Sequence, residues 1–205
     1  MSADVQAARD DLAYMRALVG GSGALQSTMG EAFMWAGVLY GGQCLMHGLQ
    51  EFGLLPWDGL IGLAIALGPT LVFCVALGFI IVKDRNKPSG GVASRAMAAV
   101  FQGAGLANLV MAFVFGFGAH RVQSIGLWLY QPIVVCMFQG VAWYVAWMLV
   151  RRAWVGVVAL GWFAMTVTLG VVISNAGAYL TVLGVGLFVL MAIPGYAIWR
   201  GAKAA

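Results

Sequence analysis

Six long apolar runs constrain this chain more than any other feature of its sequence. The runs cover residues 32–50, 59–82, 96–118, 125–150, 153–174 and 178–199. Each approaches or exceeds the ~20 residues that a helix needs to cross the hydrocarbon core of a bilayer. Because backbone amides find no water inside lipid, each run is expected to be helical. The sequence therefore predicts an all-α membrane protein, a bundle of six transmembrane helices.

The composition leaves little room for anything outside the bilayer. Of the 205 residues, 62% are hydrophobic and only 9% are charged, whereas soluble domains carry about 25% charged residues. We therefore expect one transmembrane domain over residues 30–200, a preceding segment over 1–29 and a short tail over 201–205.

The basic residues predict the orientation of the chain. If the six runs cross in turn, ten of the eleven Lys and Arg residues fall on one side, and only Arg121 falls on the other. Short loops rich in Lys and Arg stay in the cytoplasm. We expect a multi-pass protein of the bacterial inner membrane with both termini cytoplasmic. On this interpretation, the net charge of +4 comes from basic residues on the cytoplasmic side of the lipid bilayer, which is the expected partner. The sequence has no basic patch with interleaved aromatic residues, the pattern that would indicate binding to a nucleic acid.

The segment before the first apolar run has the pattern of a short amphipathic helix. Residues 3–19 place apolar side chains on one helical face, and GGSG at 20–23 is expected to end the helix. Such a helix would lie on the cytoplasmic leaflet, or dock onto the bundle or a partner. The sequence leaves these alternatives open.

Catalytic patterns are missing from the sequence. Every Asp and Glu falls in a tail, in a loop or at the end of a run, and no P-loop, GxSxG or HExxH motif occurs. Proton- and ion-coupled carriers typically use charged groups inside the membrane. We therefore expect neither an enzyme nor a pump.

A few uncharged polar residues interrupt the apolar runs and are the candidates for a ligand site. They are Gln43, His47, Asn108, Cys136 and Gln139. The predicted topology lets them line a cavity between the first, third and fourth helices that opens to the periplasm. The alternative is structural, since such side chains often bond to a neighbouring helix, and this is favoured for Gln43, Asn108 and Gln139. His47 is the one histidine within the six runs, and Glu51 lies one turn away.

Three functions fit these residues. The favoured one is a binding or accessory role for a small hydrophobic ligand, a lipid or a partner membrane subunit. The second is a channel or facilitator for a neutral solute. The third is a redox protein in which His47 and His120 bind haem or a metal; no cofactor is expected otherwise.

Glycines are expected to let helices approach closely. Gly37 and Gly41 form a GxxxG pair, which suits packing within one chain and a homo-oligomer equally. Gly103 and Gly105 are expected to thin the third helix in the same way.

Four stretches resemble a family of small six-helix inner-membrane proteins of alphaproteobacteria. They are DLAYMRAL (11–18), GVLYGGQCLMHG (37–48), FQGVAWYVAWMLVRRAWVGVVALGWFAMTVTLGVV (138–172) and AYLTVLGVGLFVLMAIPGYAIW (178–199). The family has no assigned activity. The resemblance implies the six-helix topology and supplies no catalytic residues.

Overall fold

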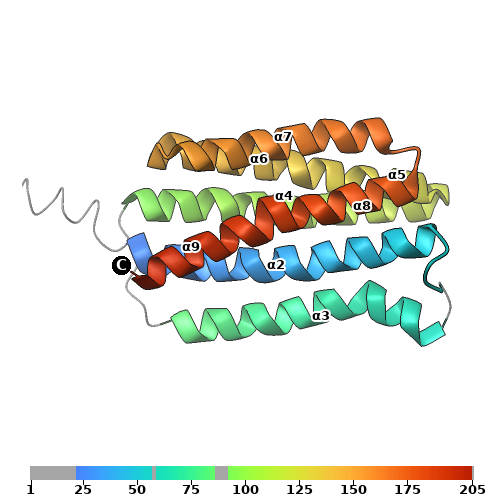
Figure 1. Cartoon of the computed structure of the whole chain (residues 1–205), viewed down its shortest axis with the longest axis horizontal. Coiled ribbons are helices and arrows are strands. Elements are labelled where there is room, and N and C mark those ends of the chain that lie inside the picture. The colour runs from blue at the N-terminus through green and yellow to red at the C-terminus, as the bar shows by residue number, and fades with distance from the viewer. Residues whose placement is uncertain (1–21, 57–58, 86–91, 205) are drawn as a thin grey trace, which may run out of the picture.

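The computed structural model describes residues 22–56, 59–85 and 92–204, and within these ranges the chain is helical without a β-strand. The helices are α2 (Ser22–Glu51), α3 (Gly59–Asp84), α4 (Val92–Val122), α5 (Ile125–Trp128), α6 (Tyr130–Val150), α7 (Ala153–Val172), α8 (Ala176–Leu187) and α9 (Ile193–Ala204), with the π-helical segment η1 (Phe188–Ala192) between the last two. They run side by side along one axis (Figure 1). The predicted all-α bundle is confirmed, and the amphipathic helix expected over 3–19 lies outside the described residues.

Five helical segments of the described chain are long and apolar enough to cross a membrane. They are Gly59–Asp84, Ser94–Val122, Ile125–Val150, Ala153–Val172 and Ala176–Ala202. The first predicted crossing is also helical, as α2, but it is not among these five. Three polar side chains, Gln43, His47 and Gln50, occupy its second half. Helix α2 packs extensively inside the bundle, against α3, α8, η1 and α9.

Two predicted runs are interrupted. The run at 125–150 contains the short α5, and α6 begins at Tyr130. The run at 178–199 passes through η1 just before Pro194. Proline lacks an N–H and its ring clashes with the carbonyl four residues earlier, so the wider π turn keeps the chain helical there. Helix α2 also starts earlier than expected, at Ser22, inside the GGSG stretch at 20–23.

Small residues bring α2 against the last crossing. A Cβ built at Gly37 would lie 2.4 Å from the backbone nitrogen of Ala192, and one built at Gly41 would lie 3.1 Å from the carbonyl oxygen of Gly184. The GxxxG pair therefore packs within one chain, which answers the question that the sequence left open. Gly103 and Gly105 have nothing within 4 Å of the built Cβ, so the prediction that they bring α4 close to a neighbour is wrong.

The core lies between α6, α7 and α8, with α4 along one side. Its largest fully buried side chains include Trp143, Trp162, Tyr179 and Leu169. The Tyr179 hydroxyl donates a hydrogen bond to the carbonyl oxygen of Leu129 at 2.5 Å. This bond ties α8 to the residue between α5 and α6, which is where the predicted single helix is interrupted.

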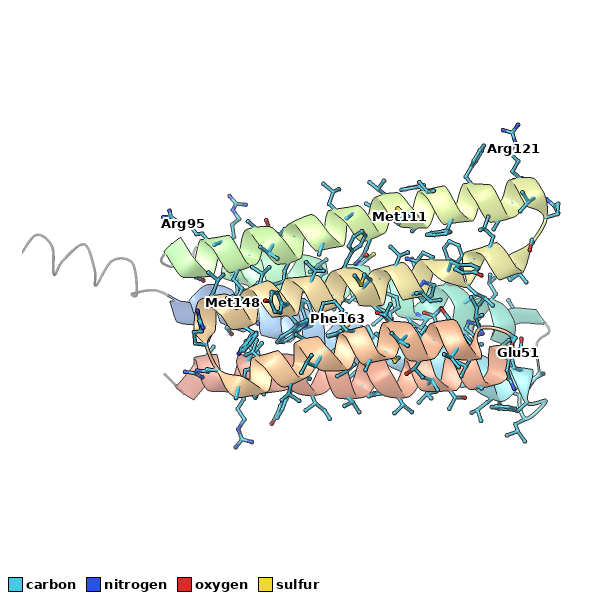
Figure 2. All side chains as sticks on the ribbon, turned by 90° about the horizontal axis from the view of Figure 1, so that it is seen from above. Glu51, Arg95, Met111, Arg121, Met148 and Phe163 are labelled. Carbon is cyan, nitrogen blue, oxygen red and sulfur yellow. The ribbon has the colours of Figure 1, made fainter. Side chains whose placement is uncertain are left out.

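The bundle has two distinct ends. Figure 2 places Arg95 and Met148 at one end and Glu51 and Arg121 at the other. We call these the Arg95 end and the Glu51 end. At the Arg95 end, Lys83 of α3 forms an ion pair with Glu31 of α2.

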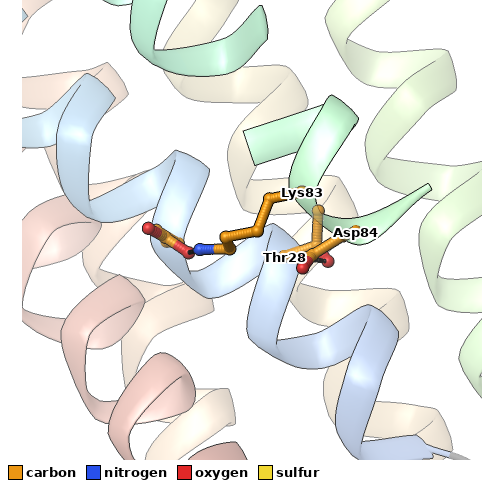
Figure 3. A network of polar contacts seen from close by, with 4 residues as sticks. Thr28, Lys83 and Asp84 are labelled. Atoms are coloured by element: carbon orange, nitrogen blue, oxygen red, sulfur yellow. Dashed lines mark hydrogen bonds and ion pairs between the residues drawn. The ribbon is translucent and has the colours of Figure 1, made fainter. Parts of the chain in front are cut away.

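A second contact closes the same junction between α2 and α3. The Thr28 hydroxyl donates a hydrogen bond to Asp84, next to the Lys83–Glu31 pair (Figure 3). Both carboxylates at this junction are thus engaged by residues of the neighbouring helix.

Candidate ligand-binding pocket

A cavity of about 550 Å³ opens at the Arg95 end of the bundle. It is lined from five helices: the first described turns of α2 and α4, the last turns of α6 and α9, and the start of α7. Its size lies within the ~300–1,000 Å³ typical of small-molecule sites. Apart from Arg152, the lining is apolar or aromatic.

Aromatic rings form the floor of this pocket. Phe101 of α4 meets Trp143 of α6 edge-on, with ring centroids 5.6 Å apart, and Trp154 of α7 meets Trp143 with centroids 6.1 Å apart. Trp143 is only 2% exposed. Its indole Nε1 is buried without a hydrogen-bond partner, and leaving a buried donor unpaired costs about 1–3 kcal/mol. This nitrogen is enclosed by the packing and does not face the cavity, so the floor that a bound molecule would meet is made of aromatic carbon atoms.

A two-residue turn places a guanidinium at the mouth. Arg151 ends α6 with φ 56°, in the left-handed region, and its N–H donates to the carbonyl oxygen of Trp147 at 2.7 Å. This tight ending turns the chain directly into α7, so that Arg152 lines the pocket. Arg152 is exposed and has no ion-pair partner within the described residues. Among the described residues, the mouth thus presents a cation without an ion-pair partner, and the exposed Ala197 also lines the pocket.

Gln43 lies in the other half of α2 and serves the helix packing. Its side-chain Nε2 donates to the carbonyl oxygen of Ala66 on α3 at 2.8 Å, which is the interhelical hydrogen bond expected for it. Pro69 lies inside α3 one turn further on. Helices tolerate such prolines in lipid when neighbours bond to the loosened backbone, so Gln43 supports α3 where its own hydrogen bonding is weakest.

His47 anchors the loop at the Glu51 end. Its Nδ1 lies 2.7 Å from the Oε1 of Gln50, and the Nε2 of Gln50 donates to the carbonyl oxygen of Pro56 at 2.8 Å. Gln50 is fully buried. The residue paired with Nδ1 is thus Gln50 rather than Glu51, and the pair connects α2 to the loop that leads into α3.

The remaining candidates lie inside the bundle. Cys136 and Gln139 are buried one turn apart on α6, and Asn108 is half-buried on α4. The side-chain oxygens of Asn108 and Gln139 are buried without a hydrogen-bond partner, so the interhelical bonds expected for these two oxygens are not formed.

The five candidate residues do not coincide with the pocket. None of Gln43, His47, Asn108, Cys136 and Gln139 lines it, and a ligand role for them stays a prediction. Sequence reasoning missed the pocket because its lining residues read as ordinary core and interface residues. The available signal was the sequence RRAW at 151–154, in which a cation precedes an aromatic residue at a membrane boundary.

The histidine pair proposed for haem or metal is placed as follows. His120 is exposed in the last turn of α4, whereas His47 is half-buried in α2. In the described part of the chain, no three or more His, Cys, Asp or Glu side chains gather as a metal-binding group.

Comparisons with known proteins add no identification. No protein-family model, no curated protein and no solved structure matches the chain. The function must therefore be argued from the pocket itself.

Proposed function

We propose that this chain is a bacterial inner-membrane protein, with both termini cytoplasmic, that binds a small hydrophobic molecule or lipid in the pocket at the Arg95 end. The observation that carries the proposal is the 550 Å³ cavity, whose apolar and aromatic lining includes one charged side chain, that of Arg152. Most small-molecule sites combine an apolar concave lining with a few polar groups that fix orientation. The pocket has both features.

The position of the pocket supports a ligand that arrives from the membrane. The pocket is built from the ends of helices that are long and apolar enough to span a bilayer. Its mouth carries Arg152 and lies at the end of the bundle where Figure 2 places Arg95, and the positive-inside rule assigns such a basic end to the cytoplasmic interface. A molecule that partitions into the cytoplasmic leaflet would therefore reach this mouth without crossing water.

The Lys and Arg distribution and the resemblance to alphaproteobacterial six-helix proteins are the grounds for the proposed orientation and membrane. Both remain predictions from sequence. The five apolar segments supply the membrane character on which the proposal depends.

Native mass spectrometry of the purified protein tests the proposed function. The probe is a neutral C16 alcohol, added in detergent micelles to the wild type and two variants. Ala197→Phe puts a ring into the mouth of the pocket, because Ala197 lines it and is exposed. Ala164→Phe adds the same ring at an exposed alanine of α7 that does not line the pocket.

The expected result is one bound alcohol on the wild type and on Ala164→Phe, and loss of that adduct in Ala197→Phe. Equal binding to all three proteins would show that the alcohol sits on the lipid-facing surface and not in the pocket. That result would refute the proposed function.

A further inference from the structure

We propose that the occupant of this pocket is a single-chain amphiphile whose anionic head group, a carboxylate or a phosphate, is held by Arg152 at the mouth. This inference rests on the proposed function, because it concerns the same pocket. It adds the chemical class of the ligand and the residue that selects it.

The charge at the mouth favours an anion. Arg152 lines the pocket and has no ion-pair partner among the described residues. The two described acidic side chains at the α2–α3 junction of this end are engaged elsewhere, since Glu31 pairs with Lys83 and Asp84 accepts from Thr28. A guanidinium matches carboxylate and phosphate groups through paired hydrogen bonds. The anion that Arg152 lacks among the described residues is the one that we assign to the ligand.

The volume of the pocket favours one chain. If each non-hydrogen atom takes about 30 Å³, the share of a water molecule in the liquid, a cavity of about 550 Å³ holds about 18 such atoms. That number fits one C16 chain with part of its head group. It is too small for the two chains of a diacyl lipid.

The arrangement along α6 gives the pocket a polar mouth and a deep apolar part. Trp143 lies seven residues before Val150 on α6, about 10 Å along the helix axis, and Arg152 follows in the turn after the helix. Ala146 and Val150 line the pocket between Trp143 and Arg152. An elongated molecule with its charge at one end fits this polarity better than a compact one.

Competition between three C16 ligands tests the inference. The ligands are palmitate, palmitoyl lysophosphatidate and hexadecanol, each measured by native mass spectrometry in neutral detergent on the full chain. We expect the anionic ligands to bind about two- to fivefold more tightly than the alcohol, because an exposed guanidinium contributes modestly in water. If palmitate is preferred, the source is a free fatty acid; if the lysophosphatidate is preferred, it is a lysophospholipid.

Three variants test whether Arg152 causes the preference for the anionic ligands. Arg152→Gln is expected to abolish it, Arg152→Lys to retain part of it through the charge, and the control Arg121→Gln at the Glu51 end to leave it unchanged. An alcohol bound as tightly as the anions, or an unchanged preference in Arg152→Gln, would overturn the inference.

The pocket variant separates the two proposals. If Ala197→Phe prevents binding of all three ligands, but the wild type binds the alcohol as tightly as the anions, the inference fails while the proposed function stands. If Ala197→Phe binds all three as the wild type does, both fail.

Discussion

Adding one methyl group at Gly37 is expected to destabilise the bundle. A Cβ at this position would lie 2.4 Å from the backbone nitrogen of Ala192 and 2.8 Å from its Cα. Because carbon atoms normally approach to about 3.5–4.0 Å, α2 and the last crossing would have to separate by about 1 Å. The obstructing atoms are backbone and cannot rotate away. Gly37→Ala should therefore reduce the free energy of unfolding by about 1–3 kcal/mol, the usual cost of overpacking.

Gly42→Ala is the matched control on the same helix. A Cβ built at Gly42 meets nothing within 4 Å, so this variant gains helix propensity, up to about 1 kcal/mol, without a clash. Unfolding in mixed micelles of rising SDS fraction, followed by circular dichroism, compares the two variants. If Gly37→Ala proves as stable as Gly42→Ala, the close packing of α2 against Ala192 is refuted.

Three further predictions use simpler changes. Gln43→Leu removes the hydrogen bond to Ala66 and should lower the free energy of unfolding by about 0.6 kcal/mol. Gln139→Leu removes a buried unpaired oxygen and should leave the free energy of unfolding unchanged or raise it. A Gln139→Leu protein less stable than Gln43→Leu would contradict the bonding described. Tyr179→Phe removes the hydroxyl that donates to Leu129 and should cost about 1 kcal/mol in the same SDS titration, so an unchanged midpoint would argue against that bond. A green fluorescent protein fused to the C-terminus should fluoresce, and an alkaline phosphatase fused there should be inactive, because the C-terminus is expected in the cytoplasm. The opposite pair of signals would show that the predicted topology is wrong.

Much of the fold could be predicted from the sequence because lipid permits few alternatives. A run such as 59–82 has to be helical to satisfy its backbone, and the observed helix is Gly59–Asp84. The interruptions at Leu129 and before Pro194 were not foreseen. Both depend on tertiary fit, since the carbonyl of Leu129 accepts from Tyr179 fifty residues away, and sequence periodicity does not report such a contact.

The candidate site could be predicted only in part, for a physical reason. Polar residues within apolar runs are conspicuous in a sequence, and Gln43 and His47 do make the kinds of polar contact that buried amides and imidazoles need. A pocket lined by apolar side chains produces no comparable pattern in the sequence, because its lining residues resemble those of the packed core. Trp143 at the pocket floor and Trp162 in the packed core are both buried tryptophans, and only the three-dimensional arrangement shows which of them borders a cavity.

Photo-crosslinking with a C16 fatty acid that carries a diazirine in its chain tests the central claim most directly. After irradiation in lipid nanodiscs, peptide mapping locates the adducts. The pocket predicts adducts concentrated on its lining residues within 143–155 and 197–202, and their loss in Ala197→Phe but not in Ala164→Phe. Adducts spread over the exposed faces of α3 and α4, with none in those two segments, would contradict the assignment of the pocket as a ligand site.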